Sequence, residues 1–317
     1  MIGRVVTKVG GVPVARRLVT ATPGLRDTTR RFVGGDDASS AVIAAESLHD
    51  QGLRSTLSLC GGEVRTTAEA EEHVRAYAEL GTRLASAGCA AASELTVTLA
   101  QLGLHAPGGW QRALHRLHDV VGHAADRRLF VTLGLDDEGD VEETLAAVVA
   151  VREDHPSLGV ALHARLARTE DDCRMLSGPG SRVRLLKGSH ALAGAEPRVA
   201  PERLDDSYLR CLEILMHGQG YPMVATHDRR LIDAALRSAR DNGRKPPEWE
   251  VQMLLGVRRS DARALAADGV RVRVCVPYGP DWYAAFVSRI AERPSNLRLL
   301  AQALLPREDL ALVPDPV

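Results

Sequence analysis

Eight short apolar runs alternate with longer amphipathic stretches along most of this chain, and this alternation constrains the fold more than any other feature. The runs are rich in Val and Leu with weak alternation, as expected of parallel strands that are buried on both faces. Strands are predicted over residues 55–59, 95–99, 129–133, 159–163, 183–187, 222–226, 249–253 and 270–276. Eight strands that alternate with helices favour an α/β fold, a closed (β/α)8 barrel of the TIM type.

The stretches between the strands carry helix signals. Helices are predicted over residues 67–85, 141–154, 205–218 and 228–242, with Thr66 or Thr67 and Asp140 as N-caps. An open doubly wound sheet is the alternative, but that fold needs a Gly-rich phosphate loop after its first strand. The early candidate, Cys60-Gly61-Gly62-Glu63, lacks the GxGxxG spacing, and the barrel is therefore preferred.

The chain is expected to form a single domain of 317 residues. Residues 1–50 are predicted as an N-terminal helical extension, residues 51–280 as the barrel, and residues 281–317 as C-terminal helices. One of these last helices is expected to cross the barrel mouth. The Gly- and Pro-rich segments 107–110 and 177–181 are predicted as turns between elements.

The composition excludes several classes of function. A net charge of −1 and an aromatic content of 3% argue against a nucleic-acid partner, which needs basic and stacking side chains. The five cysteines form no CxxC pair, and the polar groups at the strand ends show no metal-ligand spacing, so no metal and no disulfide framework is expected. The odd cysteine count and the lack of a long apolar run indicate a cytoplasmic protein without a signal peptide or transmembrane segment.

Polar residues gather where the fourth to sixth strands end, which is where such barrels build their sites. Arg184, Lys187 and Gly188 suit an anionic cofactor, because cations and close backbone N–H groups bind phosphate. The alternative is an ion pair at the barrel mouth. Thr226-His227-Asp228 precedes a helix, and this segment predicts an anion site, a simple N-cap or both. His163 ends the fourth strand, where a single histidine is more often structural than functional.

Two further polar groups stand near the barrel ends. Glu250 and Gln252 are two residues apart on one strand, so they share a face, either in the barrel interior or in a polar layer at the strand ends. Arg289 lies on the helix after the eighth strand, beside Glu292 and Arg293. That helix carries either a solvated charge run or an arginine aimed over the barrel mouth.

Several motifs in this order are specific. They are residues 184–188, 225–228, 252–254, 256–259, 276–279 and 291–294, with weaker matches at 95–104 and 168–172. Across residues 31–300 the chain resembles the proline dehydrogenase family, FAD-dependent barrel enzymes that oxidise proline to pyrroline-5-carboxylate. The resemblance implies the same barrel and an FAD cofactor.

The resemblance also implies cofactor contacts, residue by residue. Arg184 matches an arginine near the flavin, where a cation favours the reduced, anionic ring. His163 replaces a glutamine, Leu135 replaces a methionine and Ser189 replaces an alanine. The predicted cofactor-binding set is Leu135, His163, Arg184, Lys187, Gly188, Ser189, Thr226, His227 and Glu292. Arg184, Arg289 and His190 are the predicted catalytic residues.

The substrate side differs from the family pattern. Thr98 stands in place of the active-site lysine, Gly134 in place of an aspartate, and Cys275 in place of a tyrosine. His190 replaces a second tyrosine. Two arginines of the family clamp the proline carboxylate, and here Ser288 replaces the first while Arg289 keeps the second. Gly62 stands where the family has the glutamate that pairs with that first arginine, although Glu63 is adjacent.

These replacements predict a remodelled substrate pocket of Thr98, Gly134, Cys275, Ser288 and Arg289. Losing a charged contact costs about 2–5 kcal/mol in comparable truncations, so the lost charges disfavour proline. The sequence predicts a flavoprotein oxidoreductase that oxidises the C–N bond of a small amine or amino-acid-like substrate other than proline. A genuine proline dehydrogenase and a non-catalytic relative that binds flavin or a partner protein are the alternatives. The electron acceptor stays open between a quinone, oxygen and another compound.

Overall fold

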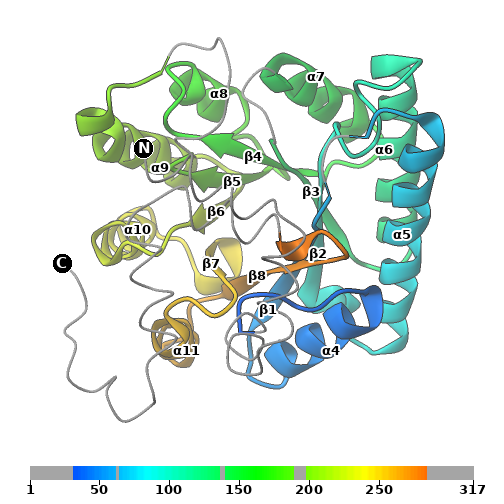
Figure 1. Ribbon diagram of the computed structural model, residues 1–317. Helices are drawn as coiled ribbons and strands as arrows, with labels where there is room; N and C mark the ends of the chain where they lie inside the picture. The colour runs from blue at the N-terminus through cyan, green and yellow to red at the C-terminus, as the bar shows by residue number, and fades with distance from the viewer. Residues whose placement is uncertain (1–30, 62–63, 136–139, 189–197, 284–317) are drawn as a thin grey trace, which may run out of the picture.

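The structure, a computed structural model, describes residues 31–61, 64–135, 140–188 and 198–283. Its strands close into one parallel barrel in the sequence order β1 to β8, and helices surround the strands (Figure 1). The strands are β1 Arg54–Leu59, β2 Ser93–Val97, β3 Phe130–Leu133, β4 Gly159–His163, β5 Arg182–Leu186, β6 Tyr221–Ala225, β7 Glu250–Leu254 and β8 Val272–Tyr278. The predicted (β/α)8 barrel is confirmed, and each strand lies within one or two residues of its predicted position.

The described helices are α4 Ala38–His49, α5 Thr67–Ser86, α6 Gly109–Ala125, α7 Val141–Arg152, α8 Thr169–Met175, α9 Leu204–His217, α10 Arg229–Asp241 and α11 Arg259–Ala267. Helix α4 packs against β1 and β8 on the outside of the barrel. It confirms helical structure in part of the predicted N-terminal extension. Residues 1–30 and the predicted C-terminal helix over the mouth lie outside the described residues.

The two N-caps predicted from the sequence have different outcomes. Thr66 begins α5 with a full capping box, in which its hydroxyl accepts from the Glu69 N–H and the Glu69 carboxylate accepts from the Thr66 N–H. Asp140 is the N-cap residue of α7, as predicted, but its side chain makes no cap bond. Its carboxylate lies 3.3 Å from Nε2 of His105 instead.

The apolar core lies between the outer face of the sheet and the helices. Leu57, Leu95, Val131, Val160 and Val251 on the strands are buried against helical residues such as Leu80, Leu117, Val148 and Leu231. The inner face of the barrel is different, because charged and hydroxyl side chains fill much of it. Successive residues of a strand point to opposite faces, so apolar residues that face the helices alternate with polar residues that face the barrel interior.

Candidate active site

The amino-terminal half of the barrel interior holds a closed network of buried charges. Glu94 on β2 accepts from Arg182, at 3.1 Å, and from Arg184 on β5. Arg273 on β8 donates to Glu250 on β7 at 2.6 Å, and Gln252 donates to the same Glu250 oxygen at 2.7 Å. The prediction that Glu250 and Gln252 share a face is confirmed, and that face is the barrel interior.

The two buried carboxylates stay ionised because arginines surround them. Burial alone pushes the pKa of Glu94 upward, but the charges of Arg184, Arg273 and Arg182 outweigh burial and hold that pKa at about 2. Burial and nearby charges act on Glu250 in the same way, and Arg273 lowers its pKa. In this half of the barrel each buried carboxylate has an arginine partner, and the ion pairs link β2 to β5 and β7 to β8.

Arg184 connects this network to the layer above it. Its guanidinium donates to Glu94 and, at 2.9 Å, to the Thr96 hydroxyl on β2. A longer bond of 3.4 Å reaches Thr56 on β1. Among the described residues, the Arg184 Nε atom is buried without a hydrogen-bond acceptor. The arginine is therefore held firmly in the barrel interior by its terminal nitrogens, while Nε stays open to a ligand.

Lys187, just beyond the end of β5, is already paired within the protein. Its Nζ atom lies 2.6 Å from Asp205 Oδ1 and 3.4 Å from Asp228 Oδ2. The ion-pair interpretation of this lysine therefore describes what the structure shows. The adjacent Gly188 has a φ of +92°, a left-handed conformation that favours glycine.

The segment after β6 forms an N-cap, as one of the two predicted interpretations requires. Asp228 begins α10, and its carboxylate accepts from the Arg230 N–H at 3.0 Å. The Thr226 hydroxyl accepts from the Asp228 N–H at 3.1 Å. The His227 ring turns toward β7, where its Nε2 accepts from the Leu254 N–H at 2.9 Å. The anion site at this helix start stays a prediction.

His163 at the end of β4 is a buried and uncharged histidine. Burial lowers its pKa to about 4, and the neighbouring charge of Arg165 adds to the effect. Its Nδ1 atom is buried and has no hydrogen-bond partner among the described residues. At neutral pH the ring is neutral and a weak base, which favours a hydrogen-bonding role over that of a proton acceptor.

Arg165 is a residue of the mouth that the sequence analysis missed. Its side chain is only 8% exposed. A Cβ atom built on Gly188 would lie 2.6 Å from Arg165 Cδ and 3.2 Å from His163 Cβ, so the arginine lies across the end of β5. A polar residue two positions after His163 continues the alternation that points His163 inward, and that spacing is the signal that could have identified Arg165.

Of the residues predicted for the substrate pocket, the structure brings Thr98 and Gly134 together at the ends of β2 and β3. A Cβ atom built on Gly134 would lie 3.2 Å from Cγ2 of Thr98 and 3.3 Å from Cγ2 of Thr96. Cys275 is half-buried on β8, which pairs with β1. Leu135 is half-buried and packs against the apolar core. Glu63, Ser189, His190, Ser288, Arg289 and Glu292 lie outside the described residues.

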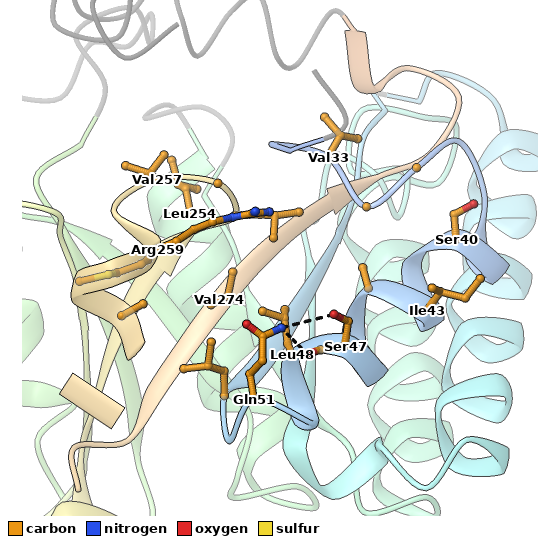
Figure 2. Close-up of a pocket in the computed structure, with 18 of the residues that line it drawn as sticks. Val33, Ser40, Ile43, Ser47, Leu48, Gln51, Leu254, Val257, Arg259 and Val274 are labelled. Carbon is orange, nitrogen blue, oxygen red and sulfur yellow. Dashed lines mark hydrogen bonds between the residues drawn. The ribbon is translucent and has the colours of Figure 1, made fainter. Parts of the chain in front are cut away.

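A cavity of about 670 Å³ lies elsewhere, on the outside of the barrel between α4, α11 and the ends of β7 and β8. Figure 2 shows Arg259 extending along it, and Gln51 hydrogen-bonded to Ser47 at its edge. It contains none of the residues predicted for the site. The described residues contain no helix long and apolar enough to cross a membrane, and no group of three or more metal-ligating side chains.

Comparison with known proteins identifies the family. The proline dehydrogenase of Deinococcus radiodurans is 30% identical over 282 residues, which make up 87% of this chain and 89% of that protein. This chain belongs to the proline dehydrogenase family. Proline dehydrogenase 1 of Bacillus subtilis is 29% identical over 286 residues, 89% of this chain and 92% of that protein. The sequence profile described as proline dehydrogenase matches residues 200–283.

Solved structures confirm the fold of this proline dehydrogenase family member. Proline utilization A from Bdellovibrio bacteriovorus, inactivated by N-propargylglycine, superposes with a TM-score of 0.75 at 18% identity over 90% of this chain. The D778Y mutant of proline utilization A from Bradyrhizobium japonicum gives 0.70 at 20% identity over 89%. The chain spans about a third of the length of these structures, 34% and 32%. Membership of the family makes the protein an oxidoreductase.

Proposed function

We propose that this protein is an FAD-dependent oxidoreductase that oxidises the C–N bond of a small amine or amino-acid-like compound other than proline. Family membership supports the reaction type, and the barrel mouth is where a TIM-type enzyme builds its site. The substrate is a small molecule that reaches the ends of β2, β3 and β8. The proposal has two separable parts, the cofactor and the substrate.

The residues of the mouth fit FAD. The Arg184 Nε and His163 Nδ1 atoms are buried and lack a partner among the described residues, as expected where a ligand supplies one. Gly188 provides the left-handed turn at the β5 end, and α10 begins beside it with its N-terminus at the carboxyl end of β6. Arg184, His163, Gly188 and the Thr226–His227 segment would hold the cofactor.

The chemistry is a two-electron oxidation of a C–N bond. Bound FAD would supply the two-electron oxidant for this reaction, taking up the hydride of the substrate carbon as a C=N bond forms and the nitrogen proton leaves to solvent. Arg184 would provide a fixed positive charge beside the flavin, because Glu94 and Thr96 hold its terminal nitrogens in the barrel interior. His163, whose pKa is about 4, serves as a neutral hydrogen-bonding group rather than as the proton acceptor.

One observation carries the proposal of a substrate other than proline. Thr98 and Gly134 lie next to each other in the mouth, where the resemblance places a lysine and an aspartate. Cys275 on β8 stands in place of a tyrosine. These three positions of the wall are therefore small and uncharged, and they lack the side chains that would orient a zwitterionic ring by charge. A smaller or less polar amine fits such a wall better.

Proline itself is the second candidate. The relatives from Deinococcus radiodurans and Bacillus subtilis, named proline dehydrogenases, match 87% and 89% of this chain. Arg289, which the resemblance matches to a carboxylate-binding arginine, is present in the sequence. Binding through this one arginine would allow some proline turnover in spite of the changed wall.

Anaerobic flavin reduction separates the two parts. The purified protein, reconstituted with FAD, is mixed with excess proline, and the flavin absorbance is followed before dithionite is added as a control. We expect dithionite to bleach the flavin and proline to leave it oxidised. Rapid bleaching by proline would establish the ordinary family activity. A protein that binds no FAD would refute the cofactor part and favour a non-catalytic relative.

A further inference from the structure

Two residues in otherwise buried strands are open to solvent. Thr96 is the half-buried residue of β2, and Cys275 is the half-buried residue of β8. The Thr96 hydroxyl accepts from Arg184 across the barrel, so this side chain points inward. Cys275 pairs with Thr56, whose hydroxyl lies 3.2 Å from that of Thr96, so the thiol faces inward as well. Because helices cover the outside of the strands, solvent reaches Thr96 and Cys275 from inside the barrel.

The wall beside this floor presents methyl groups. Cγ2 of Thr96 and Cγ2 of Thr98 lie 3.3 Å and 3.2 Å from a Cβ atom built on Gly134. The hydroxyls of both threonines serve the protein instead. That of Thr96 accepts from Arg184 at 2.9 Å, and that of Thr98 accepts from the Gln101 N–H at 3.3 Å. Between β2 and β3 two polar residues therefore turn apolar atoms toward the position of Gly134.

The strands supply no carboxylate at the level of this floor. Their two acidic residues, Glu94 and Glu250, lie lower in the barrel and are paired with arginines. Arg184 reaches the floor, but Glu94 and Thr96 hold its terminal nitrogens, so a substrate carboxylate would have to displace them. A charged group that enters beside β2 and β8 would lose water without gaining an unengaged partner of opposite charge from the strands, and this is costly.

We propose that the substrate is an alkyl or cyclic alkyl amine without a carboxylate, whose hydrocarbon part lies over Thr96 and Cys275 and against the methyl group of Thr98. This proposal rests on the proposed function and narrows its substrate class. The carbon beside the nitrogen loses a hydride to the flavin, the nitrogen loses a proton to solvent, and an imine forms. Apolar contact with methyl and thiol groups favours such a molecule over an amino acid.

Cys275 provides a readout of binding that does not depend on turnover. The other four cysteines of the chain are buried: Cys60, Cys89, Cys173 and Cys211. Methyl methanethiosulfonate is a small uncharged reagent, and a thiolate attacks its sulfur to form a mixed disulfide while methanesulfinate leaves and the thiol proton goes to solvent. Mass spectrometry follows this labelling in the FAD-loaded protein without oxygen. A ligand that covers Cys275 slows the labelling, and Cys275→Ser confirms the labelled site.

The ligands are three pairs that differ in one carboxylate: pyrrolidine and proline, piperidine and pipecolic acid, and butylamine and norvaline. In each pair we expect the amine to protect Cys275 with a dissociation constant at least about tenfold lower than that of the amino acid, because a carboxylate left unpaired costs at least this much. Flavin absorbance is recorded in the same samples. We expect at least one of the amines, and none of the amino acids, to bleach it.

A variant with a new charge tests whether the methyl wall sets the preference. Thr98→Lys places a cation beside Gly134 and should narrow the preference for the amine by at least about threefold. Ser86→Lys is the matched control, because Ser86 is the exposed last residue of α5 and precedes β2 at the other end of the barrel. It should leave all six dissociation constants unchanged. Bound FAD and the labelling of Cys275 show that Thr98→Lys is folded.

Three results would overturn the proposal. Better protection by the amino acids would show that the substrate carries a carboxylate. Normal labelling of Cys275 in the presence of all six compounds would show that amines do not bind over this floor. A ligand-free protein in which Cys275 is not labelled would show that the floor is closed. Failure to bind FAD would instead refute the proposed function, and labelling of the protein without flavin would still measure the preference between amine and amino acid.

Discussion

The two halves of the barrel interior contrast in how their polar groups are satisfied. In the amino-terminal half, Glu94 and Glu250 are fully buried, and each is bound by arginines from neighbouring or facing strands. In the carboxyl-terminal half, small residues such as Gly134 line part of the wall, and His163 carries a buried nitrogen that lacks a partner among the described residues. Among the described residues, the buried carboxylates of one half are thus paired with arginines, whereas the other half keeps a buried histidine nitrogen open to a ligand.

This difference separates a part of the barrel interior that holds the strands together from a part that can bind a ligand. A buried ion pair contributes little net stability, but removing one partner leaves a charge stranded and is costly. The amino-terminal network therefore fixes the strands in one arrangement. The mouth can change its residues more freely because few buried charges depend on them, and the departures from the family pattern that the sequence predicts at Thr98, Gly134 and Cys275 fall outside the ion network.

The largest effect on stability is expected from removing a buried carboxylate of the amino-terminal half. Glu94→Gln should lower the free energy of unfolding by about 3–5 kcal/mol, because it leaves Arg182 and Arg184 without their buried carboxylate. Urea denaturation measures the change. Glu142→Gln is the matched control, since that glutamate pairs with Arg168 but is 75% exposed, and it should cost no more than about 1 kcal/mol. Equal effects of the two variants would contradict the proposed role of the network.

In the mouth, His163 should make the stability of the protein depend on pH. His163 has a pKa of about 4 in the folded protein, lowered by burial and then by Arg165, against 6.5 for an ordinary histidine. The unfolded chain therefore binds more protons between these values, and stability falls as the pH drops through that window.

From about pH 7.5 to about pH 5 this histidine should cost about 2 kcal/mol of stability, measured by thermal or urea unfolding. The variant His163→Gln should lose less over the same interval. The acids of the closed half add little to this change, because the pKa of Glu94 is held at about 2 and its contribution is lost only at lower pH. A pH profile that is identical in the variant would show that His163 is not the buried neutral group.

The strands were predictable because a fully buried parallel strand leaves a plain apolar run, as in residues 159–163, where prediction and structure coincide as β4. The site was predictable only in part. Lys187 was assigned to the cofactor from its position in the sequence. Its partners Asp205 and Asp228 lie 18 and 41 residues further along the chain, so no local sequence pattern predicts these ion pairs. Arg165 was missed because it lies two residues beyond His163, where the apolar run that marks β4 has ended and only the spacing from His163 is left as a signal.

A third prediction concerns the mouth, where charged side chains can be introduced at Thr98 and Gly134. The double variant Thr98→Lys with Gly134→Asp should place the new side chains next to each other, because a Cβ at residue 134 lies 3.2 Å from Cγ2 of Thr98. We expect anaerobic reduction of the flavin by proline to be at least about tenfold faster than in the unmodified protein, a gain of about 1.4 kcal/mol in transition-state binding. Stopped-flow absorbance measures this rate.

Each single substitution should gain less, because it adds a charge without its partner. Gly134→Ala is the control for the added Cβ alone and should leave the proline rate unchanged. If the double variant reduces the flavin no faster than Gly134→Ala, the lysine and aspartate positions do not control the use of proline.

The smallest test concerns the layer between the two halves. The Thr132 hydroxyl on β3 is buried without a partner among the described residues, whereas the Thr96 hydroxyl accepts from Arg184 at 2.9 Å. Thr132→Val keeps the shape of the side chain and removes an unsatisfied polar atom, so it should be neutral or raise stability by up to about 1 kcal/mol. Thr96→Val should instead lower it by about 1 kcal/mol or more, because it removes an acceptor from a buried guanidinium. A loss in both variants, measured by urea unfolding, would place Thr132 in the satisfied half of the barrel and move the boundary between the halves toward the mouth.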